Sequence, residues 1–131
     1  MFETIRWRCF LRVRDRRAAE RVVGRVERVM GREVRMERYE RYWKIPELAE
    51  VWLVSPLHRT TAESALLTTL RSAWQVATPW SLAPPGPGPG EEFEGSAILD
   101  AGARFAVPGV EWMQFFLSEG GSRTAEGDEG G

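Results

Sequence analysis

The sequence predicts an α+β fold, a two-layer sandwich in which two helices cover one face of an antiparallel sheet. The chain twice repeats the order strand, helix, strand: apolar residues alternate in the predicted strands and recur at helical spacing in the segments between them. With 131 residues, of which 43% are hydrophobic, the chain is long enough for one domain with its own core.

The first predicted strand, residues 5–14, is apolar on one face and cationic on the other. The apolar face holds Ile5, Trp7, Cys9, Leu11 and Val13. The opposite face holds Arg6, Arg8, Phe10, Arg12 and Arg14. Four guanidinium groups on one strand face require a counter-charge, a partner or solvent.

A first helix is predicted between Asp15, a good N-cap, and Gly31, a residue that often ends helices. Residues 33–43 return to strand-like alternation, although the pattern becomes irregular after Met36. Residues 44–47 contain a proline and read as a turn.

The third predicted strand covers residues 48–55 and stops at Pro56. Thr60 and Glu63 have the spacing of a capping box, which predicts the start of a second helix that ends at Pro79. The predicted buried stripe of this helix is Ala62, Leu66, Leu70, Ala73, Trp74 and Ala77.

Two more strands are expected in residues 93–99 and 110–117, after a loop at residues 84–92 that is rich in proline and glycine. These elements predict one domain, residues 1–117, with a ferredoxin-like βαββαβ topology and an extra C-terminal hairpin. Either C-terminal segment could pair with the first strand. Residues 118–131 are predicted to form a disordered acidic tail.

Charge is unevenly distributed along the chain. Residues 1–44 hold 13 Arg and one Lys against seven carboxylates, a net charge of +7, whereas residues 45–131 hold four Arg against twelve carboxylates, a net charge of −8. The simplest explanation is neutralisation within the fold or between two copies. An acidic or phosphate-bearing partner for the basic half is the alternative.

The sequence also indicates a compartment. Cys9 is the only cysteine, so no internal disulfide can form, and its place on an apolar strand face favours a core role. The N-terminus lacks a signal-peptide pattern, and no stretch has the length and apolarity of a membrane span. These features predict a cytoplasmic protein of bacterial type that does not associate with membranes.

The outward face of the predicted sheet is the candidate binding surface, because arginine beside exposed aromatic rings is typical of recognition surfaces. Its predicted partner-binding residues are Arg6, Arg8, Phe10, Arg12, Arg14, Trp43 and Trp52. Further candidates for this face are Tyr39, Trp112 and Phe116.

Three interpretations of this face remain open. The chain itself could cover it, with Glu50, Glu94 or Glu111 pairing with the arginines across strands. Another protein or a second copy could bind it. A single-stranded nucleic acid could stack on its aromatic residues, but the third strand lacks the basic-aromatic motif of RNA-recognition modules, and the acidic second half would repel phosphate.

The sequence therefore predicts a non-catalytic protein-interaction module, for which a role like that of an immunity protein or antitoxin would fit. The alternative is a dimeric ferredoxin-like enzyme or ligand-binding protein with a pocket near His58, Trp74 and Trp80. His58 is the only histidine and has no ligand cluster around it in the sequence, so neither a metal nor another cofactor is expected.

Overall fold

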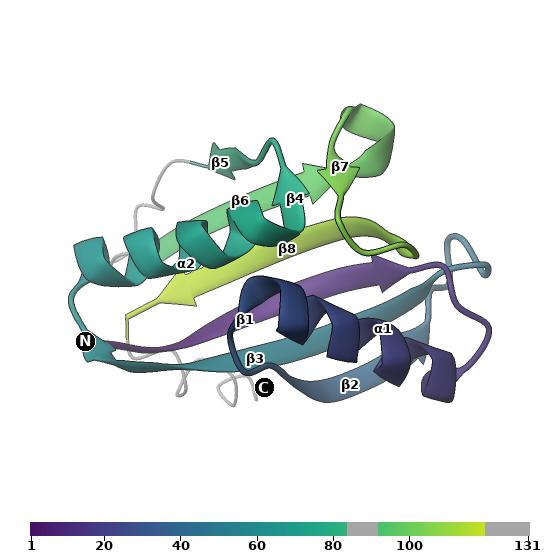
Figure 1. The fold of residues 1–131 in the computed structure, drawn as a ribbon, viewed down its shortest axis with the longest axis horizontal. Helices are drawn as coiled ribbons and strands as arrows, with labels where there is room; N and C mark the ends of the chain where they lie inside the picture. Colours follow the sequence, from purple (N-terminus) through teal and green to yellow (C-terminus); the bar gives the residue numbers. More distant parts are fainter. Residues whose placement is uncertain (84–91, 120–131) are drawn as a thin grey trace.

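The computed structural model describes residues 1–83 and 92–119, which form an α+β structure with a mostly antiparallel sheet and two long helices (Figure 1). The main sheet has the strand order β2 (Arg35–Arg41), β3 (Ala49–Thr60), β1 (Phe2–Leu11), β8 (Val110–Ser118), β6 (Glu92–Ile98) and β5 (Ser81–Ala83). Neighbouring strands in this order pair antiparallel.

Both long helices lie on the same face of the main sheet, as Figure 1 shows. They are α1 (Arg16–Met30) and α2 (Ala62–Val76). A small second sheet pairs β4 (Ala77–Thr78) with β7 (Arg104–Phe105), and a short 3-10 helix covers Leu99–Ala101. The core fills the space between the helices and the sheet; its largest fully buried side chains include Trp7, Phe2, Phe115, Ile5 and Leu53.

Helix α1 begins and ends where the sequence predicts. The Asp15 side chain accepts a hydrogen bond from the backbone N–H of Ala18 at 2.8 Å, which satisfies one of the free donors of the first turn. Gly31 adopts a left-handed conformation, with φ of 66°, and its N–H donates to the Glu27 carbonyl at 3.0 Å. Local capping chemistry therefore defines this helix.

The prediction that Pro56 ends the third strand was wrong, because β3 continues through it to Thr60. Strand β2 pairs with β3 only as far as Val54, so no neighbouring strand of the described chain pairs with β3 on that side at Pro56. The pairing of β3 with β1 is also irregular between Phe2 and Thr4. Proline is tolerated at such edges and irregularities because its missing N–H breaks no ladder hydrogen bond.

A register shift in β2 explains the irregular alternation after Met36. Met36 pairs with Leu53 and Arg38 with Trp52, so Glu37 is an extra residue in the strand. The shift turns Tyr39 toward the helices, where it packs against the core. The expectation that Tyr39 lies on the outward face was therefore wrong.

The predicted cap and buried stripe of α2 also needed correction. Thr61, not Thr60, is the N-cap, and its hydroxyl accepts from the N–H of Ser64 at 3.4 Å. The buried face consists of Ala65, Thr69, Ser72, Ala73 and Val76. Trp74 is 53% exposed. Apolar character identified this face in part, since Ala73 and Ala77 are buried and Ala62, Leu66 and Leu70 pack against the core. It missed Ala65, Thr69 and Ser72, small residues that let the helix approach its neighbours; the Thr69 hydroxyl donates to the Ala65 carbonyl.

The C-terminal strands resolve the open question of which segment pairs with β1. Strand β8 lies beside β1, and β6 lies outside β8 (Figure 1). Strand β8 includes Ser118, the first residue of the predicted tail. The rest of that tail from residue 120, and residues 84–91 of the predicted loop, lie outside the described residues.

Candidate functional site

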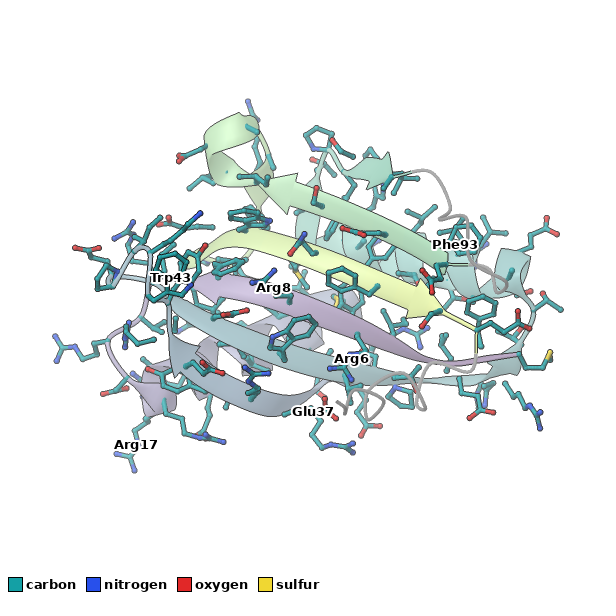
Figure 2. The ribbon with its side chains drawn as sticks, turned by 180° about the vertical axis from the view of Figure 1, so that it is seen from behind. Arg6, Arg8, Arg17, Glu37, Trp43 and Phe93 are labelled. Atoms are coloured by element: carbon teal, nitrogen blue, oxygen red, sulfur yellow. The ribbon has the colours of Figure 1, made fainter. Side chains whose placement is uncertain are left out.

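The helices leave one face of the main sheet uncovered, and we call this the open face (Figure 2). Cross-strand partners share a face, so the pairings of Arg8 with Trp52 and Gln114 place all three there. The central side chains of the open face are Arg6, Arg8, Phe10, Glu50, Trp52, Trp112, Gln114 and Phe116. Its aromatic and cationic character thus comes from β1, β3 and β8.

Arginines and aromatic rings alternate across the centre of the open face. The guanidinium carbon of Arg6 lies 5.3 Å from the ring centroid of Trp52. That of Arg8 lies 5.7 Å from the Trp52 centroid and 5.0 Å from the Phe10 centroid. Phe116 stacks on Trp52 with centroids 5.7 Å apart. These contacts restrict both guanidinium groups to a few orientations.

Phe10 is on the open face but is buried, with 1% of its surface exposed. Tyr42 and Trp112 cover its ring, with centroids 4.7 Å and 4.9 Å away. Phe10 therefore supports the surface from beneath and does not itself reach solvent.

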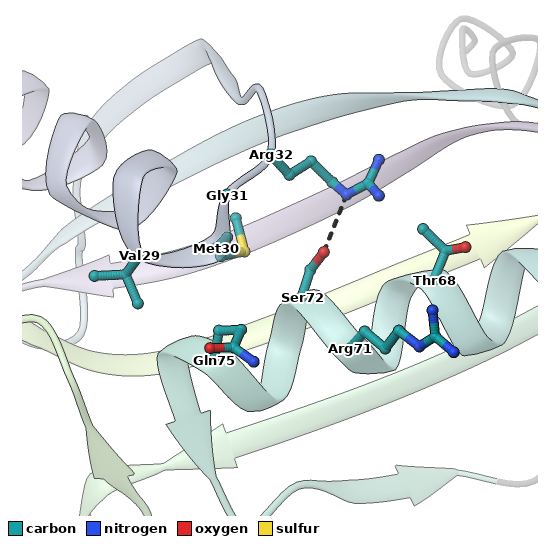
Figure 3. A pocket seen from close by; sticks show the side chains of 8 residues that line it. All are labelled: Val29, Met30, Gly31, Arg32, Thr68, Arg71, Ser72 and Gln75. Atoms are coloured by element: carbon teal, nitrogen blue, oxygen red, sulfur yellow. Dashed lines mark hydrogen bonds between the residues drawn. The ribbon is translucent and has the colours of Figure 1, made fainter.

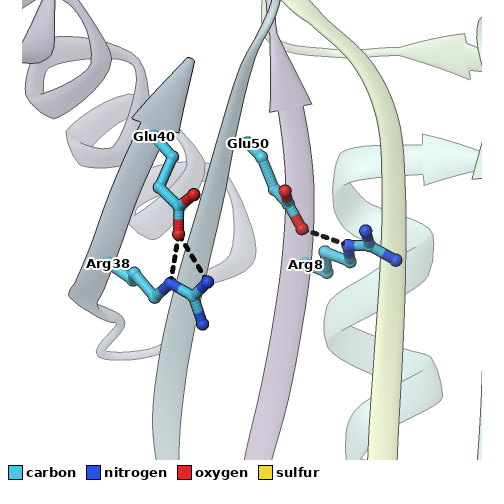
Figure 4. A network of polar contacts seen from close by, with 4 residues as sticks. All are labelled: Arg8, Arg38, Glu40 and Glu50. Atoms are coloured by element: carbon cyan, nitrogen blue, oxygen red, sulfur yellow. Dashed lines mark hydrogen bonds and ion pairs between the residues drawn. The ribbon is translucent and has the colours of Figure 1, made fainter. Parts of the chain in front are cut away.

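Carboxylates of the same chain pair with the arginines of the open face. The Arg8 Nε donates to Glu50 Oε2 at 2.7 Å, and Arg38 on β2 pairs with Glu40 (Figure 4). Arg6 Nη1 lies 3.6 Å from Glu37 Oε1. The interpretation in which Glu50 pairs with an arginine across strands is thus realised at Arg8.

Arg12 and Arg14 were wrongly predicted on the strand face, because β1 ends at Leu11 and its register with β8 shifts there. Arg12 Nε donates to Glu111 Oε2 at 2.5 Å, and this hydrogen bond, together with the charge of Glu111, raises the pKa of Arg12. The Arg14 carbonyl accepts from Arg41 Nη2 at 2.7 Å. Both residues border a shallow hollow of about 450 Å³ at the end of the sheet.

Trp43 follows the end of β2 and is 79% exposed (Figure 2). Its ring contacts Tyr42, with centroids 6.3 Å apart, and the Lys44 ammonium nitrogen lies 5.6 Å from its centroid. Tyr42 in turn covers Phe10. Trp43 therefore extends the aromatic surface beyond the end of the strands.

The structure does not bring His58, Trp74 and Trp80 together into a pocket within the described residues. His58 is exposed on β3. Trp80 is buried against Phe115, with ring centroids 5.5 Å apart, and its Nε1 donates to backbone carbonyls at 2.8 and 3.0 Å. Trp74 borders a separate hollow of about 250 Å³.

Sequence reasoning missed a cleft between the two helices, which we call the inter-helix cleft (Figure 3). It has a volume of about 450 Å³, and its lining includes Val29, Met30, Arg32, Thr68, Arg71 and Ser72. No local pattern signals it, because Arg32 and Arg71 are far apart in the sequence and meet only when the helices pack.

Two polar atoms under the open face, Trp112 Nε1 and Gln114 Oε1, are buried and have no hydrogen-bond partner among the described residues.

Burial raises the pKa of the Cys9 thiol to about 12, so Cys9 is neutral near pH 7.

The described residues contain no group of three or more His, Cys, Asp or Glu side chains arranged to hold a metal ion. Over the same residues, neither long helix has the length and apolar character needed to cross a membrane. Comparisons with protein-family models, curated proteins and solved structures found no match for this chain.

Proposed function

We propose that this chain is a small, non-catalytic interaction module of the cytoplasm that binds another protein through its open face. We also propose that its fold is ferredoxin-like, with β8 as the fourth strand and with β6 and β5 added outside it. Support for this fold comes from the strand order β2-β3-β1-β8 and from the positions of the helices after β1 and β3.

The orientation of Arg8 is the observation that carries the functional proposal. Its guanidinium lies between the rings of Phe10 and Trp52, and Glu50 accepts from its Nε. In Figure 4 its two terminal nitrogens point away from Glu50. These two nitrogens have no hydrogen-bond partner among the described residues. A carboxylate from a partner protein could therefore accept two parallel hydrogen bonds from the Arg8 guanidinium, which is already held in position.

The surroundings of Arg8 favour a protein partner over a nucleic acid. Glu37, Glu40 and Glu50 already offset most of the positive charge of Arg6, Arg8 and Arg38. A phosphate backbone needs a net cationic surface, whereas a protein surface can combine a carboxylate with apolar contacts to Trp52 and Phe116. An immunity-like or antitoxin-like neutraliser is the role that we propose for such a module; a second copy of the chain is the other protein partner to test.

The experiment compares an open-face variant, Arg8→Gln with Trp52→Ala, with the wild-type chain. Arg17→Gln is the matched control, because Arg17 is an exposed arginine on α1 (Figure 2). Tagged forms of the three proteins are purified from the source organism, and their co-purifying proteins are quantified. Each candidate is then purified and titrated directly against the three proteins. Light scattering over a range of concentrations measures self-association.

We expect one protein to bind the wild type and the control at least tenfold more tightly than it binds the open-face variant, since hot-spot losses are about 2 kcal/mol or more. A dimer that only the open-face variant fails to form would identify a second copy as the partner. A monomer that binds the same proteins with or without the open-face substitutions would overturn the proposal.

A further inference from the structure

The inter-helix cleft lies on the helix side of the sheet, away from the open face (Figure 3). We propose that it is a binding site for a phosphate group, carried either by inorganic phosphate or by a small phosphate monoester. This inference does not depend on the proposed function of the open face.

Arg32 is held in place at the cleft. Its Nε donates to the Ser72 hydroxyl at 3.0 Å, and its Nη1 donates to the Pro56 carbonyl at 3.4 Å. Its Nη2 has no acceptor among the described residues. One edge of the guanidinium is thus fixed by the protein while other donors remain for a ligand.

Arg71 contributes the second cation from α2. It is exposed and makes no hydrogen bond or ion pair with the described residues. In Figure 3, Arg32 and Arg71 extend in the same direction along α2. Thr68 lines the same cleft, so its hydroxyl adds a neutral donor to the lining.

The charge of the cleft selects an anion. Its lining, within the described chain, holds two arginines and no carboxylate, unlike the open face, where glutamates pair with the arginines. A phosphate group brings up to two negative charges and several acceptor oxygens, which suit two guanidinium groups and adjacent hydroxyls.

The apolar part of the lining leaves room for an organic group. Val29 and Met30 border the same cleft from α1. A volume of about 450 Å³ exceeds what a phosphate ion alone would fill and lies within the range of small-ligand sites. A monoester could place its phosphate at the arginines and its organic part against Val29 and Met30.

The test is an NMR titration of the full chain at low ionic strength, with inorganic phosphate and phenyl phosphate as separate probes. The variant is Arg71→Gln, which removes an exposed cation without breaking a hydrogen bond within the described residues. Arg17→Gln is the control, because it removes the same charge from the exposed surface of α1. Thermal unfolding of all three proteins checks that their folds are equally stable.

We expect the chemical-shift changes to concentrate at residues 29–32 and 68–75. Arg71→Gln should weaken phosphate binding by about tenfold or more, as expected for the loss of a charge-assisted hydrogen bond, and Arg17→Gln should leave it unchanged. Tighter binding of phenyl phosphate would identify an ester as the source of the phosphate group, and equal binding would identify inorganic phosphate.

Shift changes spread over many surface arginines would overturn the site, as would equal affinities for Arg71→Gln and Arg17→Gln. Phosphate binding and partner binding are separable, because Arg71 lies on the helix side and Arg8 lies on the opposite face of the sheet.

Discussion

Packing around individual residues limits which side chains this protein tolerates, and Gly95 is an example. Gly95 on β6 needs the absence of a side chain: a Cβ built there would lie 2.5 Å from the ring of Phe115 and 2.9 Å from Leu82. Phe115 is fully buried against Trp7 and Trp80, so its ring has no free space to move into. Close packing, and not backbone conformation, requires glycine at this position.

Replacing Gly95 by alanine should therefore lower the free energy of unfolding by about 1–3 kcal/mol, as overpacking in a core does. The control is Gly24→Ala on α1, where the nearest atom to the new Cβ is 3.9 Å away. That substitution should raise stability by about 0.5–1 kcal/mol, because alanine is the better helix former. Urea unfolding of the two variants gives both values; equal effects would contradict the packing argument.

The ionisation of Cys9 also depends on its surroundings, since burial raises the pKa of its thiol from 9.0 to about 12. Between these two pH values the unfolded chain loses the thiol proton and the folded chain keeps it. The thiol therefore leaves the free energy of unfolding unchanged below about pH 9. From there toward pH 12, its titration lowers the free energy of unfolding by about 1.4 kcal/mol per pH unit.

The measurement is urea unfolding of the wild type and of Cys9→Ala at a series of pH values. Other groups titrate in both proteins, so the difference between the two curves isolates the thiol. A constant difference between the free energies of unfolding of the two proteins from pH 8 to pH 11, about two units above the ordinary thiol pKa, would contradict the prediction. It would show that the thiol ionises equally in the folded and unfolded states.

At the scale of elements, strands β1 and β3 are joined by side-chain contacts as well as by their backbone ladder. Arg8 and Glu50 are 32% and 17% exposed and lie 2.7 Å apart. Arg59 and Glu3 connect the same two strands at 3.4 Å, but their side chains are 71% and 47% exposed. Solvent weakens the second pair much more than the first.

A double-mutant cycle should show this contrast. Arg8→Gln and Glu50→Gln, singly and together, should give a coupling free energy of about 1 kcal/mol in urea unfolding. The same cycle on Arg59 and Glu3 should give a value near zero. If the two cycles gave equal coupling, then exposure would not be what distinguishes the pairs.

Elements with local signals were predictable. The Asp15 cap and the terminal Gly31 define α1 in the sequence, and both have the predicted roles. The buried face of α2 was only partly predictable in this way. Apolar character correctly identified Ala73 but also favoured the exposed Trp74. It missed Ala65, Thr69 and Ser72, because close approach to neighbouring elements selects for small size over hydrophobicity.

At the scale of the whole molecule, the candidate surface was only partly predictable. Alternation along β1 correctly placed Arg6 and Arg8 away from the core, and Trp52 follows from the same pattern on β3. The alternation continued beyond the strand, however, so Arg12 and Arg14 were assigned to a face that ends at Leu11. A strand ends where its neighbours stop pairing, and the sequence of one strand does not contain that information.

The sequence alone determined the α+β class, the limits of α1 and the presence of arginines and aromatic rings on one face of β1. Tertiary structure decided that β8 and not β6 borders β1, and that Glu37 and Glu50 pair with Arg6 and Arg8. It also formed the inter-helix cleft, which Arg32 and Arg71 both line. Periodicity and capping depend on residues within a few positions of each other, whereas cross-strand partners and clefts depend on residues that meet only through folding.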